Sequence, residues 1–234
     1  MFEVLQKNKV YIVYDNDLIS ENIEDCFSAT YWQQQNRVIG SAQGRGTTWF
    51  VQLPTLQGAL RHYRRGGLFG KLIADHYIFS SWEKTRSIQE FRLLVKLNHG
   101  GVNVPKPIAA RVSKATFCYR ADLLSEKIAD ASDLVDILQQ RSLSRQEYQA
   151  IGLQIKKLHD AQVNHTDLNI HNILLDTAGK IWLIDFDKCY QQSGEHWKEI
   201  NLKRLLRSFH KESKKRAIKW TSKDWEVCML AYKA

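Results

Sequence analysis

The first half of the chain carries short apolar runs rich in β-branched and aromatic residues, a pattern typical of strands. One segment differs, because its apolar residues (Ile88, Phe91, Leu94, Val95 and Leu97) recur at helical spacing. A second, acidic segment also reads as a short helix. The pattern therefore predicts strands over 10–14, from 37 to a glycine-bearing turn, 47–53, 58–63, 111–119 and 121–124, and helices over 17–27 and 85–97.

The second half of the chain is mostly helical in pattern. Ser144 and Glu147 form a capping-box pair at the start of the longest predicted helix, 145–161. The other predicted elements are a short helix at 134–138, buried strands at 173–175 and 181–184, and basic helical sequence from about 197. We therefore predict an α+β fold with a strand-rich lobe over 1–125, a hinge at 125–127 and a helical lobe over 126–234.

Composition bounds the function without choosing it. The 234 residues are 44% hydrophobic and 25% charged, as in an ordinary globular protein. No apolar run approaches the ~18 residues of a membrane span, and the N-terminus lacks a signal-peptide core. We therefore expect a cytosolic protein that touches a membrane at most from that side. The four cysteines are widely spaced, which favours reduced structural thiols over disulfides or zinc ligands.

The net charge of +9 is concentrated in two places. Residues 190–234 hold eleven Lys and Arg against five Asp and Glu, and residues 61–71 hold four basic residues and no acidic one. Such patches attract anions, so nucleic acid, an acidic membrane surface and a phosphorylated substrate are all candidate partners.

The strongest chemical signal is the run HTDLNIHNILL at 165–175, followed by Asp185-Phe186-Asp187. Its H-x-D-L-x-x-x-N spacing resembles the catalytic loop of the protein-kinase-like fold, and the apolar runs around it suit a hairpin that holds both motifs. The resemblance implies a bilobal kinase that uses ATP and Mg²⁺. Asp167 would orient or deprotonate the acceptor hydroxyl, and Asn172 and Asp185 would bind the metal through oxygen.

Two weaker features support nucleotide binding. Gly40, Gly44 and Gly46 resemble a nucleotide-covering loop between two strands, although they lack GxGxxG spacing and also suit a plain hairpin turn. On the next strand the family's lysine position aligns best with Arg61, with Arg64 as the rival. Glu90 resembles its partner on the following helix, the alternative being a solvated helix acid.

The expected hinge carries a third nucleotide contact. The run LLSEKI at 123–128 falls where such kinases hold adenine by backbone groups, which points to Glu126 and Ile128.

The C-terminal region is too short for a protein kinase. Only 47 residues follow Asp187, and the metal motif lacks the glycine of DFG. Both features favour a compact kinase with a non-protein acceptor. The runs at 61–72, 89–94, 101–107 and 165–176 together resemble the lipopolysaccharide core kinases, the family of the Kdo and heptose kinases. This resemblance implies transfer of phosphate from ATP to the 4-hydroxyl of 3-deoxy-D-manno-octulosonic acid (Kdo) on a lipid A precursor, lipid IVA.

An anionic, lipid-borne acceptor also suits the two basic patches. Arg64, Arg65 and Lys71 are candidate acceptor ligands, or else belong to a solvated basic turn. The segment 202–219 is a basic amphipathic helix, which predicts peripheral association with the anionic inner membrane from its cytoplasmic side. The alternatives are a related heptose or small-molecule kinase, and a basic membrane-binding or nucleic-acid-binding module. We expect no nucleic-acid partner, because no aromatic-rich RNA motif or groove-reading signature is present.

Overall fold

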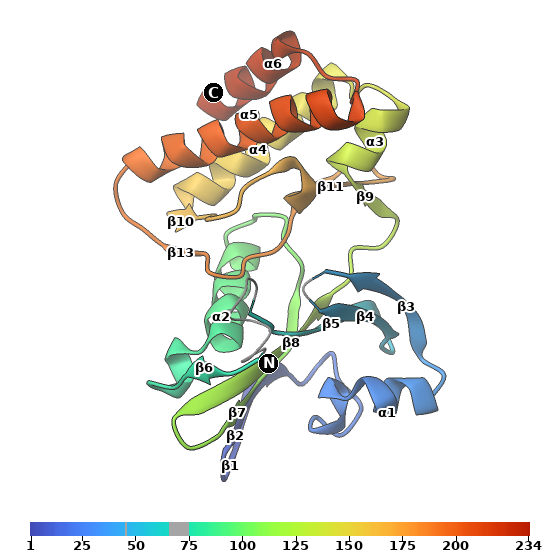
Figure 1. Cartoon of the computed structure of the whole chain (residues 1–234), viewed down its shortest axis with the longest axis vertical. Coiled ribbons are helices and arrows are strands. Elements are labelled where there is room, and N and C mark those ends of the chain that lie inside the picture. Colours follow the sequence, from blue (N-terminus) through green and yellow to red (C-terminus); the bar gives the residue numbers. More distant parts are fainter. Residues whose placement is uncertain (45, 66–74) are drawn as a thin grey trace. The chain divides into compact units, whose positions relative to one another are not determined.

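The structure is a computed structural model and describes residues 1–44, 46–65 and 75–234 (Figure 1). The chain forms two compact units. The N-terminal unit comprises Met1–Val95 and Lys106–Lys127, and the C-terminal unit comprises Lys96–Pro105 and Ile128–Ala234. The sequence predicts one division at 125/126, whereas in the structure 96–105 groups with the C-terminal unit. The α+β class is confirmed.

The N-terminal unit is built on one antiparallel sheet in the order β1-β2-β7-β8-β5-β4-β3, with β6 beside β8. Short turns join β1 to β2, β3 to β4 and β7 to β8, so most neighbours in the sheet are also neighbours in sequence. The strands are β1 (Phe2–Lys7), β2 (Val10–Asp15), β3 (Val38–Gln43), β4 (Thr47–Gln52), β5 (Gln57–His62), β6 (Tyr77–Ile78), β7 (Pro107–Lys114) and β8 (Cys118–Glu126).

Helices cover both faces of this sheet (Figure 1). On β5, Arg61 contacts Glu90 of α2 (Arg86–His99). Its neighbour Leu60 packs in the core with Trp32 of α1 (Ala29–Gln34). Consecutive strand residues point to opposite faces, so α2 and α1 lie on opposite sides. The α1 face is closed by a wholly apolar cluster that also includes Ile12, Phe27, Val51, Leu53, Ile108 and Leu124.

Two predicted elements of this unit were wrong. The segment 17–27 is not a helix but a series of turns ending in the 3-10 helix η1 (Asp25–Phe27). Its acidic and amide side chains bond nearby backbone N–H groups, as Asn22 does for Glu24, and this competes with helix formation. The predicted strand break at 120 was also misplaced. The turn lies at 115–117, and β8 runs through Arg120, whose charge only marks an outward-facing position.

The C-terminal unit is mainly helical. Ser144 and Glu147 form the predicted capping box at the start of α4. Its helices are α3 (Leu134–Gln140), α4 (Arg145–Asp160), the 3-10 helix η4 (Ile170–Asn172), α5 (His196–Arg216) and α6 (Ser222–Lys233). A further 3-10 helix, η3 (Trp82–Lys84), precedes α2 in the N-terminal unit. The short strands are β9 (Ala131–Asp133), β10 (Val163–Asn164), β11 (Ile173–Asp176), β12 (Ile181–Leu183) and β13 (Tyr190–Gln191).

Two details of the helices bear on function. The predicted basic helix over 202–219 begins earlier, at His196, and ends at Arg216, because Ala217 takes a left-handed backbone conformation (φ 51°) that stops α5. Ile218 beyond it is nevertheless buried. Within the described residues, no helix has both the length and the apolar character needed to cross a membrane.

Candidate active site

The segment between β10 and β11 forms the predicted catalytic loop, and His165 fixes its start. The imidazole is fully buried and its Nε2 lies 3.0 Å from the carbonyl oxygen of Ile184, just before the metal motif. The ring also packs 4.8 Å from that of Phe186. Burial lowers the pKa of His165, so the ring is held neutral. His165 thus ties the two sequence motifs together.

Asp167 is exposed, and its carboxylate forms no hydrogen bond or ion pair with any residue that the structure describes. Its backbone is held instead. The Asp167 carbonyl oxygen accepts hydrogen bonds from Nδ2 of Asn169 and Nδ2 of Asn172, each at 2.9 Å. The loop therefore fixes the backbone of Asp167 while its carboxylate stays available to a reacting hydroxyl.

Asn172 and Asp185 lie at the open end of one hairpin, Asn172 just before β11 and Asp185 two residues after β12. Ile173 of β11 pairs with Leu183 of β12, and the Ile184 N–H donates to the Asn172 carbonyl oxygen at 3.0 Å. Asp185 has a positive φ of 62°, an uncommon conformation for a residue other than glycine that is concentrated at functional sites. Phe186 beside it is buried and anchors the turn. The hairpin thus brings the two motifs side by side.

These two residues fit a magnesium ion. Because the Asn172 amide nitrogen is engaged with Asp167, its Oδ1 remains to face a ligand. Asp185 contributes a carboxylate at an exposed position. Mg²⁺ prefers oxygen ligands and is bound in kinases by one or two protein groups together with substrate phosphates. The donor set is therefore of the right chemistry and number.

Helix α5 holds the catalytic loop through one polar stripe that the sequence analysis missed. Asn201 Oδ1 accepts the His165 N–H at 3.1 Å, and Arg204 Nη1 donates to the His165 carbonyl oxygen at 3.4 Å. Further along, Ser208 Oγ accepts the Ile170 N–H at 3.1 Å. Glu212, buried, lies 3.6 Å from Nε2 of His171. The sequence contains a signal for this stripe, because the polar residues at 201, 204, 208 and 212 recur at helical spacing within the amphipathic pattern of α5.

In the N-terminal unit, Arg61 rather than Arg64 is the partner of Glu90. Arg61 Nη2 lies 2.7 and 2.6 Å from the two Glu90 oxygens, so one nitrogen is shared between both. The Tyr63 hydroxyl also donates to Glu90, and the Arg61 guanidinium stacks 4.8 Å from the Tyr63 ring centre. Because Glu90 is buried, this pair positions the Arg61 cation firmly. Tyr63 is a contributor that the sequence analysis did not name.

The glycine turn is only partly as expected. Gly44 and Gly46 lie in the β3–β4 turn, where the Gly44 N–H donates to the Gly46 carbonyl oxygen at 3.0 Å, whereas Gly40 lies within β3 opposite Phe50. A Cβ on Gly46 would come within 3.0 Å of Arg64 Cδ. Arg64 therefore packs against the glycine turn, which puts its cation beside a phosphate-binding type of loop.

The other candidate acceptor residues have different surroundings. Arg65 is tied to the segment before β6, since its Nε donates to the His76 carbonyl oxygen at 2.8 Å. Lys71 lies outside the described residues.

The hinge leaves one acceptor and one donor for a ligand. The Glu126 N–H donates to the Lys106 carbonyl oxygen, and the Lys106 N–H is taken by the Glu126 side chain at 3.0 Å rather than by its carbonyl. Lys127 donates its N–H to Gln57. The Glu126 carbonyl and the Ile128 N–H have no partner among the described residues. Two such groups match an adenine edge, which offers one donor and one acceptor.

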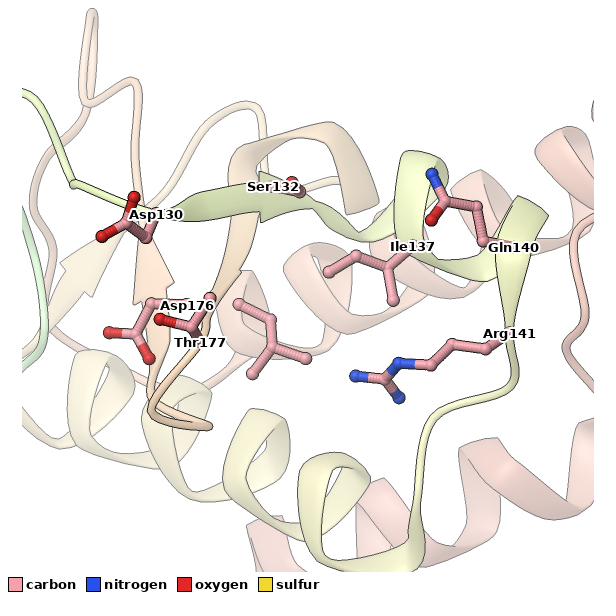
Figure 2. A pocket seen from close by; sticks show the side chains of 8 residues that line it. Asp130, Ser132, Ile137, Gln140, Arg141, Asp176 and Thr177 are labelled. Carbon is pink, nitrogen blue, oxygen red and sulfur yellow. The ribbon is translucent and has the colours of Figure 1, made fainter.

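A separate cavity of about 350 Å³ lies within the C-terminal unit (Figure 2). Two of its charged groups, Arg141 and Asp176, are engaged by the protein itself. Arg141 makes two hydrogen bonds to Glu147, and Asp176 accepts bonds from its own turn and from Trp182 Nε1. With its cation neutralised, the cavity is not suited to a phosphate. None of the predicted site residues lines it; the lining residues are Asp130, Ser132, Ile137, Gln140, Arg141, Leu175, Asp176 and Thr177.

Comparison with known proteins agrees with the geometry of both units. Residues 29–232 match the lipopolysaccharide kinase (Kdo/WaaP) family over most of the chain. The chain belongs to this family. It is therefore a phosphotransferase of the kinase type, as the motif at 165–175 predicted.

Similar proteins cover the full length of the chain. A 3-deoxy-D-manno-octulosonic acid kinase of Vibrio cholerae is 59% identical over 97% of each chain. One of Vibrio vulnificus is 57% identical over 100% of this chain and 99% of its own length. A protein of the same name from Haemophilus influenzae is 50% identical over 97% of this chain and 98% of its own.

Proposed function

We propose that this enzyme transfers the γ-phosphate of ATP to the 4-hydroxyl of Kdo on a lipid A precursor, lipid IVA carrying Kdo. The observation that carries the proposal is the Asp167 carboxylate, exposed and unpartnered among the described residues, on a loop fixed by Asn169 and Asn172. The full-length similarity to proteins named Kdo kinases supports the choice of sugar.

In the proposed reaction, Asp167 accepts the proton of the acceptor hydroxyl as its oxygen bonds to the γ-phosphorus. The bond from that phosphorus to the β–γ bridging oxygen breaks, and ADP leaves with the electron pair. Asn172 Oδ1 and the Asp185 carboxylate would hold Mg²⁺, which neutralises charge on the transferred phosphate. Catalysis is then mainly positioning and charge stabilisation.

The N-terminal unit supplies groups suited to the rest of ATP. Arg61, oriented by Glu90, supplies a permanent cation for phosphate oxygens, and a guanidinium can hold two of them. The Gly46 backbone N–H in the β3–β4 turn suits a phosphate oxygen, and the Glu126 carbonyl and Ile128 N–H suit adenine. Arg64 beside the glycine turn, Arg65 near His76 and Lys71 remain the proposed ligands for the acceptor's carboxylate or phosphates.

The acceptor is part of a lipid, so we place the enzyme at the cytoplasmic face of the inner membrane, bound peripherally. The outward side of α5 supports this, because it carries Lys203, Arg207, Lys211, Lys214 and Lys215. Each cation near an anionic surface contributes about 1 kcal/mol, screened by salt.

The test is mass spectrometry of purified Kdo–lipid IVA after incubation with the enzyme, ATP and Mg²⁺. We expect a gain of one phosphate, mapped by NMR to the 4-hydroxyl of Kdo, and no gain with Asp167→Asn. Transfer to a heptose or another small molecule instead, with none to Kdo, would replace the proposed acceptor. Salt-dependent DNA binding without any phosphoryl transfer would contradict the assignment as a whole.

A further inference from the structure

Two of the most exposed large apolar side chains of the described chain lie together at one end of the N-terminal sheet. Ile78 is 84% exposed and Phe117 is 83% exposed. Ile78 pairs with Cys118, and the Phe79 N–H donates to the Phe117 carbonyl oxygen at 3.0 Å, so the two residues sit on adjoining backbone. Isolated exposed apolar residues are common, but two neighbours with so little cover at one tip are not.

Cations surround this tip. The Lys114 N–H donates to the Lys9 carbonyl oxygen at 2.7 Å, which joins the β7–β8 and β1–β2 turns at the same end of the sheet (Figure 1). Neither lysine has a carboxylate within ion-pair distance among the described residues. Arg120, 56% exposed at its side chain, lies three residues from Phe117 and pairs with Asp75 at 3.5 Å. The segments 7–9, 76–82 and 113–121 contain no acidic residue, and nearby acids are paired: Glu24 with Lys7, Asp75 with Arg120 and Glu83 with Arg92.

The base of the tip is rigid. The Phe79 ring packs edge-on against Trp82 at 4.9 Å and against Tyr119 at 6.3 Å. Lys114 Nζ lies 4.4 Å from the centre of the Phe79 ring. The folded sheet therefore presents Ile78 and Phe117 without a loop having to order on binding, and this removes one cost of association.

We propose that this sheet-end surface, made of Ile78, Phe117, Lys9, Lys114 and Arg120, inserts its two apolar side chains into the interface of an anionic bilayer. The choice of a bilayer rests on the proposed function, because the acceptor of that reaction is carried by a lipid. An anionic bilayer interface binds protein surfaces in which apolar side chains lie next to Lys and Arg. A protein partner fits less well, because lysine is depleted from protein interfaces and two side chains supply little area.

The experiment measures sedimentation of the full chain with vesicles of phosphatidylethanolamine and phosphatidylglycerol, without nucleotide or acceptor. We expect Phe117→Ser and Ile78→Ser each to weaken binding on the order of tenfold, from the lost apolar transfer. Lys114→Gln should weaken it about fivefold at low salt and less at high salt. Leu230→Ser is the matched control, an exposed apolar residue (65%) on α6 that should leave binding unchanged.

Three results would overturn the proposal: wild-type protein that stays off the vesicles, a double serine variant that binds as wild type does, or an equal loss in Leu230→Ser. A dimer in sedimentation velocity that the same serine variants dissociate would assign the surface to a second copy of the chain instead. Thermal unfolding should not change, since both side chains are exposed. The readout needs no phosphoryl transfer, so a wrong acceptor would leave the vesicle result standing.

Discussion

At the scale of single residues, the candidate site separates groups held rigidly from groups left available. The Asp167 backbone is fixed by two asparagine side chains, while its carboxylate has no partner among the described residues. A general base needs this combination, because it must be positioned before the acceptor arrives and must not be neutralised by the protein.

Asp167→Asn should lower kcat by on the order of 10²- to 10⁴-fold, because it removes the proton acceptor and keeps the shape. ATP affinity, measured by calorimetry, should change little. Asp160→Asn is the control, since that carboxylate is exposed and, within the part of the chain that the structure describes, pairs with Lys156 on α4. A variant with near wild-type kcat would exclude Asp167 as the base.

Because Glu90 orients Arg61, we expect substitutions at the two residues to have coupled rather than additive effects on ATP use. Glu90→Gln should raise the KM for ATP because the Arg61 guanidinium loses its orienting carboxylate, and Arg61→Ala should raise it further. In the double variant the second change should add little, which a double-mutant cycle on kcat/KM for ATP measures. Strictly additive effects would show that Glu90 does not act through Arg61.

At the scale of elements, α5 links the catalytic loop to the helical unit. Its residues 201, 204, 208 and 212 recur at helical spacing and each contacts the loop. In the sequence, α5 begins at His196, and only a short segment that contains β13 separates it from Asp185-Phe186-Asp187. The position that a long substrate-binding segment would occupy in the sequence is thus taken by a support for the loop.

Asn201→Ala should therefore reduce kcat more than it raises the KM for ATP, because the His165 N–H loses its acceptor and the loop loosens. Lys223→Ala, at an exposed position of α6, should leave both constants unchanged. Asn201→Asp retains the accepting oxygen but loses the Nδ2 donor to Asn164 Oδ1 (2.8 Å) and buries a charge, so it should recover little of kcat. If Asn201→Ala lowered only the melting temperature, its role would be structural.

Helix α6 depends on a single glycine of α4. A Cβ on Gly152 would lie 2.1 Å from the Cys228 carbonyl oxygen, so the helices can approach only where no side chain intervenes. Gly152→Ala should destabilise the protein by about 1–3 kcal/mol through overpacking, despite the higher helix propensity of alanine. Denaturant unfolding measures this change. Gln146→Ala, on an exposed position of the same helix, should be neutral or slightly stabilising.

At the scale of the whole molecule, the sequence predicted what local pattern and motif spacing determine. The β5 strand, the long helices α2 and α4, the capping box and the 165–185 motifs all follow from short-range periodicity. What it could not supply depends on tertiary contact. The 17–27 segment has helix-like composition but folds as turns over the sheet. Arg61 rather than Arg64 is the partner of Glu90, because α2 places Glu90 beside Arg61.

The stability of the molecule should depend on pH through His159. This residue lies near the end of α4 and is buried, with its Nδ1 2.9 Å from the Tyr232 hydroxyl of α6. Burial lowers its pKa from 6.5 to about 4, so the folded protein resists protonation that the unfolded chain accepts. The stabilising contribution is therefore complete above about pH 6.5 and is lost as the pH falls toward 4.

The lowered pKa of His159 corresponds to about 3 kcal/mol of unfolding free energy lost between pH 6.5 and 4, on the order of 1.4 kcal/mol for each pH unit. The free energy of unfolding in urea should fall between pH 7 and 4.5, with His159 contributing this slope and the buried His165 acting in the same direction. His159→Gln cannot titrate, so it should begin less stable at pH 7 and show a flatter profile. His196→Gln, at the start of α5, is the control and should keep the wild-type slope. Parallel profiles for wild type and His159→Gln would show that another group governs acid stability.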